Sequence, residues 1–425
     1  MGHFETAYWK SDADGPTRKD RLQGTYHPYA PDSLANAEIA LSSDAAGACE
    51  AAAIALTELE ATATYSATAE SLARIMLRSE AISSSRIEGL EMNARRLLEI
   101  EALDEIGVPH RPNSTEVEVL GNINAMREAI AQTSGKSELT LADVRAIHRA
   151  LLANTKLAEY GGVLRDSQNW IGGSWYHPLS AAYVPPRPER VEPLLSDLVE
   201  FINVSRLPAL ATAAVAHAQF ETIHPFVDGN GRAGRALVHV ILRRAGLCER
   251  TTPPISLVLN TLKDQYLGAL SEYRFDVEAD DGPTRDQAVS QWVEFFCYAT
   301  EVACARTRDF EERMAELRQR WQEKVVPRRG SAAELLLDAL PGNPVVSIAS
   351  VARITGRSYP AARGAVRSLE EHGVLAQSSK NRKSGLYVAD EVLKQFTLFE
   401  RSIATPRGDT RVERPARPVP QRPRR

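Results

Sequence analysis

The chain is poor in cysteine and has no long apolar run. Its 425 residues include four cysteines, and none of these forms a Cys-x-x-Cys pair or a cluster with zinc spacing. The N-terminal stretch MGHFETAYWKSDADG lacks the apolar segment of a signal peptide, and no apolar run is long enough to cross a bilayer. We therefore expect a cytoplasmic protein in a reducing compartment, without a disulfide scaffold, a structural zinc or a membrane partner.

Aromatic residues and net charge are also sparse. Aromatic side chains make up 6% of the chain, and its five methionines and five tryptophans are too few to indicate a cofactor-binding cluster. The formal net charge of −4 neither favours nor excludes a nucleic acid partner. With 43% hydrophobic and 25% charged residues, the composition is that of an ordinary globular protein, and the length predicts two to four domains.

Apolar residues recur at helical spacing over most of the chain, from about Ala37 to Ala305. Thr140 is the expected N-cap of one helix, with Asp143 at its third position. The exception is the segment 161–191, where Gly-Gly pairs, aromatic residues and Pro-Pro predict a short β-hairpin. We therefore predict a mainly α fold with one small hairpin.

Shifts in composition divide the chain into five segments. A polar arm leads into helices, a charged helix ends at the sequence PRRGS, and a small module follows it. The last stretch is rich in Pro and Arg and cannot form a core, so we expect it to be disordered. The expected segments are an arm with the first helices (1–110), a helical core (111–305), a connecting helix (306–330), a C-terminal module (331–396) and a tail (397–425).

The stretch HPFVDGNGRAGR, residues 224–235, carries the strongest functional signal. Gly229, Gly231 and Gly234 satisfy the dinucleotide fingerprint Gly-x-Gly-x-x-Gly. That fingerprint needs a buried strand before the glycines, whereas the preceding LATAAVAHAQFETI is Ala-rich with helical spacing. No alternation of strands and helices surrounds it, so we do not expect a dinucleotide site.

A phosphate site accounts for the same residues better. Gly229, Asn230 and Gly231 can turn successive backbone N–H groups toward one anion. A helix that begins near Arg232 adds the positive end of its dipole. Arg232 and Arg235 are three residues apart, so both can reach one polyphosphate from the same face of the first turn.

Three further residues of the stretch complete a catalytic set. The Asp228 carboxylate is suited to hold Mg²⁺ on the phosphates, and His224 is the natural general base. Phe226 lies between the polar residues His224 and Asp228, two positions away on either side, and we expect it to anchor the loop in the core. A plain helix–helix turn without a ligand is the alternative, but such a turn does not require a His, an Asp and two Arg around its glycines.

The stretch resembles the signature of the Fic family, HPF-x-[D/E]-G-N-G-R-x-x-R, at every position. The likeness extends over roughly residues 26–305: RDSQNWIGG and AAYVPP resemble the family's flap hairpin, and Tyr266 matches a tyrosine that approaches the adenosine. The resemblance implies an all-helical Fic core that transfers AMP from ATP to a Ser, Thr or Tyr hydroxyl of a target protein or of itself. It implies that His224 deprotonates this hydroxyl and that Asp228 coordinates Mg²⁺.

The same resemblance assigns the nucleotide site. It implies that the α- and β-phosphates lie on the backbone from Gly229 to Gly231 and on Arg232, and that the γ-phosphate lies on Arg235. Gly234 and Tyr266 complete the set of residues expected to bind ATP. Relatives with an altered motif transfer other groups, and the unaltered motif here favours AMP, although no base-reading pattern separates ATP from UTP.

The stretch SSSRIEGLE, residues 83–91, has two interpretations. By itself it is a helix end, with Gly89 just past the helix and Glu88 in solvent. It also resembles the inhibitory motif of class II Fic proteins, [S/T]-x-x-x-E-[G/N], through Ser84, Glu88 and Gly89. That resemblance implies that Glu88 pairs with Arg235, displaces the γ-phosphate and restrains AMP transfer.

The sequence of the C-terminal module predicts a winged helix-turn-helix. A short helix, a tight turn at Gly356 and a longer helix capped by Ser358 precede a two-stranded wing, and one face of the longer helix is apolar. Similar modules are often attached to Fic proteins. Its basic residues could contact DNA phosphates, or the module could serve dimerisation or target docking. Those basic residues are Arg357, Arg363, Arg367, Lys380, Arg382 and Lys383.

Two functions other than AMP transfer stay open at this stage. One is a DNA-binding regulator whose Fic core senses a nucleotide, and the other is a hydrolase that removes AMP with Glu88 as its active group. A homodimer is an open alternative by analogy with relatives. Among the remaining histidines, we expect His148 and His239 to be packed in the core and His177, in the flap, to be exposed.

Overall fold

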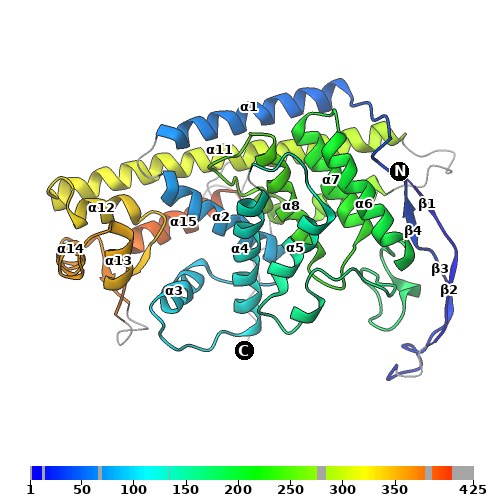
Figure 1. Ribbon diagram of the computed structural model, residues 1–425, viewed down its shortest axis with the longest axis horizontal. Helices are drawn as coiled ribbons and strands as arrows, with labels where there is room; N and C mark the ends of the chain where they lie inside the picture. Colours follow the sequence, from blue (N-terminus) through cyan, green and yellow to red (C-terminus); the bar gives the residue numbers. More distant parts are fainter. Residues whose placement is uncertain are drawn as a thin grey trace, which may run out of the picture. The chain divides into compact units, whose positions relative to one another are not determined.

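The computed structural model describes residues 2–11, 15–65, 69–133, 135–274, 284–378 and 385–403, and these are mainly helical (Figure 1). They form two compact units. The first comprises Met1–Ala53, Asn124–Gly246 and Asp264–Tyr298, and the second comprises Ile54–Ile123, Leu247–Lys263 and Ala299–Arg425. Among the described helices, none has the length and apolar character needed to cross a membrane.

The centre of the first unit is a pair of helices, α7 (Ala209–Ile223) and α8 (Asn230–Arg244), that pack closely against each other. Helix α7 is rich in alanine and buried along its whole length, because small side chains let neighbours approach on every side. Gly234 allows the close approach of α8, since a Cβ there would lie 2.9 Å from Phe220 Cδ1. The pair therefore has little room for larger residues.

Two further helices support this pair from within the first unit. Helix α6 (Pro188–Val204) packs on α7, and α5 (Leu141–Leu152) packs on α8. The predicted cap of α5 is confirmed: Thr140 Oγ1 accepts the Asp143 N–H at 3.2 Å, and Asp143 accepts the Thr140 N–H at 3.0 Å. Helix α10 (Lys263–Tyr273) lies almost entirely in this unit.

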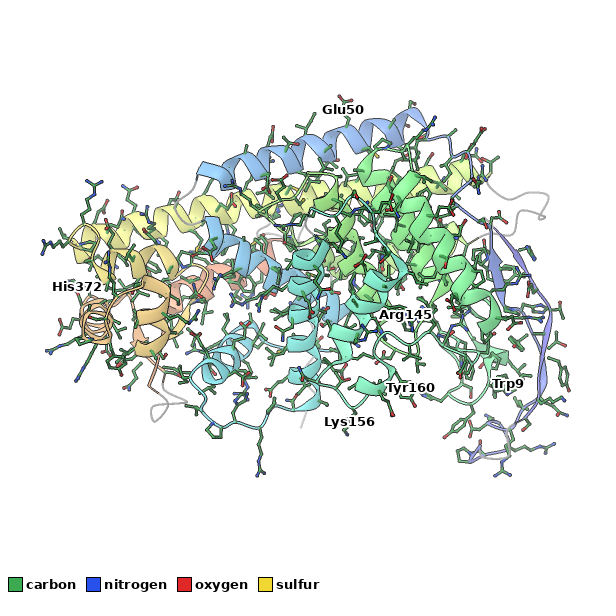
Figure 2. All side chains as sticks on the ribbon, viewed as in Figure 1. Trp9, Glu50, Arg145, Lys156, Tyr160 and His372 are labelled. Atoms are coloured by element: carbon green, nitrogen blue, oxygen red, sulfur yellow. The ribbon has the colours of Figure 1, made fainter. Side chains whose placement is uncertain are left out.

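The N-terminal arm contains two pairs of short antiparallel strands. Strand β1 (Gly2–Phe4) pairs antiparallel with β4 (Tyr29–Pro31), and β2 (Ala7–Trp9) pairs antiparallel with β3 (Gly24–Tyr26). Trp9, labelled in Figure 2, meets the edge of Trp170 at a ring-centroid distance of 5.3 Å. The arm therefore contacts the flap segment.

The predicted flap hairpin is reduced to a single bridge. Ile171 N–H donates to the Tyr183 carbonyl at 2.8 Å, and Ala182 N–H donates back to Ile171 at 2.8 Å. Gly172 and Gly173 both have positive φ angles, and a short 3-10 helix (Pro178–Ser180) fills the loop. These features stop the ladder from extending, so the expected short hairpin consists of a single bridge.

The helices of the second unit surround a separate core. Helix α2 (Ala69–Ile87) packs on α9 (Ile255–Thr261), and α3 (Ala94–Glu105) follows α2. Two long helices, α1 (Ser43–Tyr65) and α11 (Arg285–Val325), contribute to both units. Residues 306–325 are helical, as expected for the connecting helix, but they continue α11 without a break at residue 305.

The C-terminal module of the second unit begins with α12 (Ala332–Ala339). Strand β5 (Val345–Ser347), α13 (Ile348–Thr355) and α14 (Tyr359–Glu371) follow, and then β6 (Ala376–Gln377) and β7 (Leu386–Val388). The strands form one antiparallel sheet in the order β5-β7-β6. This order of elements is typical of a winged helix. The module closes with α15 (Asp390–Ile403), which extends beyond the expected boundary at 396 because Phe396 and Phe399 pack on Phe310.

Several expected details of this module are confirmed. Gly356 ends α13 with a left-handed φ of 62°, and Ala362, Val366 and Leu369 are buried on one face of α14. Ser358 is at the N-cap position, although its side chain makes no capping hydrogen bond. Lys380, Arg382, Lys383 and the part of the expected tail from residue 404 onward lie outside the described residues.

Candidate active site

The HPFVDGNGRAGR stretch forms the turn between α7 and α8. Helix α7 ends at Ile223, and His224 caps it in a left-handed conformation with φ 50° and ψ 60°. Gly229, with φ 76°, precedes the first residue of α8. A left-handed backbone is rare for a residue other than glycine, so the strain at His224 is offset by the contacts around it.

Arg165 holds the strained residue in place. Its guanidinium is buried and donates to the carbonyl of His224 at 2.9 Å from Nε and to the carbonyl of Ile223 at 3.3 Å from Nη2. Further bonds reach Ser167 and Pro186. Burial lowers the pKa of Arg165 to about 10, which leaves the side chain charged at neutral pH. Nothing in the local sequence indicates the four carbonyl partners of Arg165, so its role is visible only in the structure.

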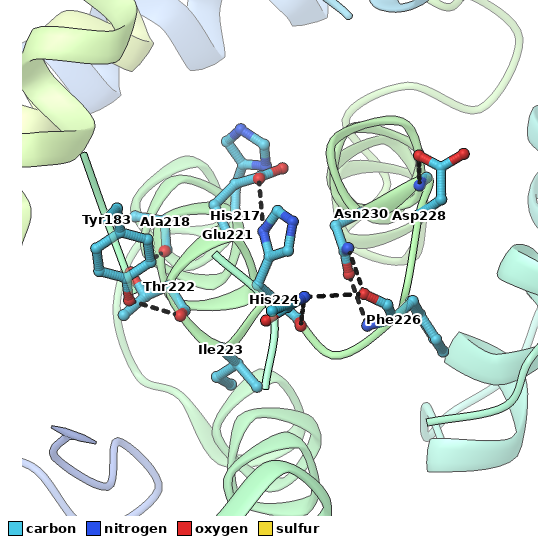
Figure 3. A network of polar contacts seen from close by, with 12 residues as sticks. Tyr183, His217, Ala218, Glu221, Thr222, Ile223, His224, Phe226, Asp228 and Asn230 are labelled. Carbon is cyan, nitrogen blue, oxygen red and sulfur yellow. Dashed lines mark hydrogen bonds and ion pairs between the residues drawn. The ribbon is translucent and has the colours of Figure 1, made fainter. Parts of the chain in front are cut away.

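Asn230 closes the turn on itself. The Phe226 N–H donates to Asn230 Oδ1 at 2.8 Å, and Asn230 Nδ2 donates to the Phe226 carbonyl at 2.8 Å (Figure 3). The Asn230 side chain therefore shapes the loop, and its backbone N–H is the group available to a phosphate. Phe226 is fully buried, which confirms the expected anchor.

His148 supports the same loop from α5. Its ring stacks on Phe226 with centroids 3.7 Å apart and planes 3° apart. Nδ1 accepts the Gly162 N–H at 2.9 Å, and Nε2 donates to the Asp228 carbonyl at 2.8 Å. Burial lowers the pKa of His148 to about 4, so the ring is neutral. His148 is packed, as expected, but its role in holding the loop is visible only in the structure.

Asp228 lies over the N-terminus of α8. Its side chain is half exposed, Oδ1 accepts the Gly229 N–H at 2.7 Å, and Oδ2 lies 3.6 Å from Arg232 Nη2. No cluster of three or more metal-ligating side chains occurs among the described residues. A single accessible carboxylate fits Mg²⁺, which proteins often bind through one or two carboxylates together with substrate phosphates.

His224 faces a carboxylate from the preceding helix turn. Glu221 Oε2 lies 4.0 Å from His224 Nδ1, and Figure 3 shows the two side chains turned toward each other. The His224 side chain is 20% exposed, so it borders solvent. This contact is too long for a hydrogen bond, and the role of His224 as the proton acceptor stays a prediction.

The two motif arginines are buried in the first unit. Arg232 and Arg235 each have about 2% of their surface exposed, and both lie within the first two turns of α8. Burial, together with the nearby charge of Arg235, lowers the pKa of His217 to about 3. The neutral His217 ring lies 2.8 Å, through Nε2, from the hydroxyl of Tyr266. Tyr266 is itself buried, and its contact with adenosine stays a prediction.

The residues that the motif predicts to be inhibitory belong to the second unit. Helix α2 ends at Ile87, and Gly89 has a φ of 83°, as the helix-end interpretation expects. Ser84 is buried within α2, and Glu88 is exposed in the turn that follows it. The pairing of Glu88 with Arg235 stays a prediction.

The predictions for the other two histidines differ in outcome. His239 is buried on α8, as expected. His177 is only 4% exposed and contacts the Lys19 carbonyl at 3.0 Å through Nε2, so the expectation of an exposed histidine is wrong. The N-terminal arm covers this part of the flap, and the flap sequence contains no sign of that cover.

Comparison with known proteins agrees with the geometry of the turn. Residues 138–242 match the Fic/DOC family, and residues 46–131 match the N-terminal region of the same family. The chain is 31% identical over 202 residues to the protein adenylyltransferase Fic of Drosophila grimshawi, which covers 46% of this chain and 37% of the relative. It is 29% identical over 184 residues to protein adenylyltransferase fic-1 of Caenorhabditis briggsae, covering 42% of this chain and 33% of the relative.

These curated relatives are therefore matched over about a third of their own length. Among solved structures, a Fic family protein from Desulfovibrio desulfuricans G20 is similar with a TM-score of 0.51 and 20% sequence identity, over 82% of this chain and 97% of that chain. This similarity concerns the fold alone. Together with the intact motif at the α7–α8 turn, the two family matches show a Fic/DOC domain at residues 138–242 and the N-terminal region of the same family at residues 46–131.

Proposed function

We propose that this protein transfers AMP from ATP to a Ser, Thr or Tyr hydroxyl of a protein. The observation that carries the proposal is the α7–α8 turn. There a left-handed His224 and the N-terminus of α8 meet, with the half-exposed Asp228 beside them. The names of the curated relatives support the same chemistry.

In the proposed reaction His224 Nε2 accepts the proton of the target hydroxyl. The hydroxyl oxygen forms a bond to the α-phosphorus, the bond from that phosphorus to the bridging oxygen breaks, and pyrophosphate leaves. The backbone N–H groups at the start of α8, with Arg232 and Arg235, neutralise the negative charge on the phosphates. When bound, Mg²⁺ would be held by Asp228 and would polarise the phosphate oxygens.

We further propose that Glu88 restrains this reaction. Its family pattern predicts a charge-assisted pair with Arg235, which would remove the partner of the γ-phosphate. The α-phosphate would then lie out of line for attack, and a small misalignment of this kind costs a large factor in rate. The same glutamate could instead position a water that removes AMP, and the experiment below separates the two outcomes.

The test is mass spectrometry of the intact protein after incubation with ATP and Mg²⁺. The forms compared are the wild type, Glu88→Gly and Glu88→Gly combined with His224→Ala. We expect added AMP on Glu88→Gly that is absent from the double variant. Loss of AMP from modified Glu88→Gly after addition of wild-type protein would favour the hydrolase. Each form is also incubated with a cell lysate. If no form adds AMP to itself or to a lysate protein, the proposed transfer is contradicted.

A second candidate function is DNA binding by the C-terminal module. The tight turn at Gly356 places α14 after α13, and α14 exposes Arg363 and Arg367. Arg367 is paired with Glu371 at 2.8 Å, which offsets part of that charge. Retardation of a DNA duplex that weakens steeply with salt and is lost in Arg363→Glu would support this function. A salt-independent shift, or none, would oppose it.

A further inference from the structure

The C-terminal module holds helix α2 along its length. At the start of α2, the Ser71 hydroxyl donates to the carbonyls of Asp338 and Ala339 at 3.3 and 3.4 Å. Gly342 approaches so closely that a Cβ there would lie 2.3 Å from the Ser71 carbonyl oxygen. In the middle of α2, Arg78 Nη1 donates to the Gly342 carbonyl at 2.8 Å.

At the end of α2 the contact is an ion pair with α15. Arg86 Nη1 lies 2.8 Å from Glu400 Oε1, and the two side chains are only 21% and 17% exposed. Ser71, Arg78 and Arg86 are seven or eight residues apart, so they project from one face of the helix. One face of α2 is therefore docked on residues 338–342 and on α15.

Arg86 also spans the turn that contains Glu88. Its second nitrogen, Nη2, donates to the Met92 carbonyl at 3.2 Å, beyond the turn. The Lys263 ammonium donates to the Ile87 carbonyl at the last residue of α2. The backbone before and after Glu88 is thus fixed by side chains, and one of these, Arg86, is itself held by Glu400.

The helix after the turn rests on the same module. Leu98, Ala102 and Leu103 of α3 form one buried apolar cluster with four residues of the module. Those four residues are Val345, Leu386, Val388 and Leu393. Arg95, at the start of α3, pairs with Asp390 of α15 at 3.0 Å. Both sides of the Glu88 turn are consequently attached to residues 338–403.

We propose that the C-terminal module sets the position of Glu88, with Arg86 and Glu400 as the positioning residues that connect them. The inference rests on the proposed inhibition by Glu88 and adds that the C-terminal module controls this inhibition. A displacement of α15 breaks the Arg86–Glu400 pair, releases the support of the turn and raises AMP transfer. The module is in this sense the regulatory part of the protein.

The experiment uses the full chain with Glu400→Lys, which places two like charges together. We expect its rate of AMP incorporation from labelled ATP to rise at least fivefold over wild type. The exchanged pair, Arg86→Glu with Glu400→Arg, should return the rate part of the way toward the wild-type value, because it restores the ion pair but not the bond from residue 86 to the Met92 carbonyl. The matched control is Glu371→Lys, which breaks an exposed pair on α14 of the same module and should leave the rate unchanged.

Two further measurements separate positioning from a general loss of structure. In the Glu88→Gly background, Glu400→Lys should change the rate less than twofold, because the turn no longer carries the inhibitory group. Amide hydrogen exchange should quicken at least fivefold over residues 85–92, where the N–H groups of Glu88, Gly89 and Leu90 are bonded to Ser85 and Arg86. Exchange in α7 and α8 should be unchanged.

The outcomes distinguish this inference from the proposed function. If Glu88→Gly is active and Glu400→Lys resembles wild type, the inference is wrong and inhibition by Glu88 stands. If no form transfers AMP, the proposed function fails, and the regulatory claim fails with it. If exchange over residues 85–92 does not change in Glu400→Lys, the positioning role is wrong whatever the activity.

Discussion

Both the turn at residues 224–229 and the turn at residues 88–92 have bonds between near neighbours, but the turn at residues 88–92 is also supported by side chains far along the chain. In the first turn, Phe226 and Asn230 bond each other and Asp228 bonds Gly229. In the second turn, the supporting contacts come from Lys263 and Glu400, which are 176 and 314 residues from the groups they bind. Both turns can be recognised in the sequence, but the distant partners that support the second turn cannot.

The first turn is also supported by two residues that are distant in the sequence. Arg165 bonds the carbonyl of His224, and His148 bonds the carbonyl of Asp228. These residues orient a loop whose internal bonds are already specified by the motif. Replacing His224 and Arg165 separates the contribution of the turn's own residues from that of such supports.

The largest effect is expected from the residue at the centre of the first turn. His224→Asn keeps a side chain that tolerates the left-handed backbone but removes the proton acceptor. In the Glu88→Gly background, AMP transfer should fall by about 10²–10⁴-fold, the usual contribution of a general base. Initial rates with labelled ATP measure this loss. A rate within about tenfold of the parent would mean that His224 is not the base.

Removal of Arg165 tests the distant support of the first turn. Arg165→Met leaves several buried carbonyls without a donor, and the expected loss of unfolding free energy is about 3 kcal/mol. Urea denaturation followed by circular dichroism measures it. A loss below about 1 kcal/mol would mean that the turn is held by its own residues and does not depend on Arg165.

Substitution of Gly234 tests the packing that brings α7 and α8 together. Gly234→Ala places a Cβ 2.9 Å from Phe220 Cδ1 and 3.0 Å from Glu221 Oε1, and overpacking of this kind costs about 1–3 kcal/mol. Gly268→Ala in α10 is the matched control, because nothing lies within 4 Å of its Cβ. The control should stabilise the protein by about 0.4–1 kcal/mol. Equal melting shifts for both variants would contradict the packing argument.

The smallest effect concerns acid stability. Burial and Arg235 hold the pKa of His217 at about 3 in the folded protein, below its ordinary value of 6.5. The unfolded chain therefore binds the proton first, and the stability contribution of the neutral ring is lost as pH falls from about 6.5 toward 3. Between pH 6.5 and 5.5 this loss is about 1 kcal/mol.

The replacement His217→Gln provides the comparison, because glutamine does not titrate and can still reach Tyr266. Urea midpoints for both proteins at pH 7.5, 6.5 and 5.5 measure the difference. The wild type should lose more stability than the variant as the pH falls. Parallel curves would show that His217 does not contribute to the acid loss.

The sequence predicted well wherever a few neighbouring residues determine the geometry. The capping box of Thr140 and Asp143, the left-handed Gly356 and the buried face of α14 all follow from spacings of three or four residues. The predictions failed where burial depends on distant segments. His177 is covered by the arm, and α15 continues past residue 396 because its phenylalanines pack on α11.

By itself, the sequence of this protein determined a mainly helical fold and a motif suited to phosphate chemistry, because both depend on residue types at short, fixed spacing. Only the tertiary structure decided which side chains hold these elements in place. Arg165, His148 and Glu400 satisfy backbone groups or charges that lie far from them along the chain. A buried charge or carbonyl requires a bonding partner. These partners come together only when the chain folds, so no local sequence pattern identifies them.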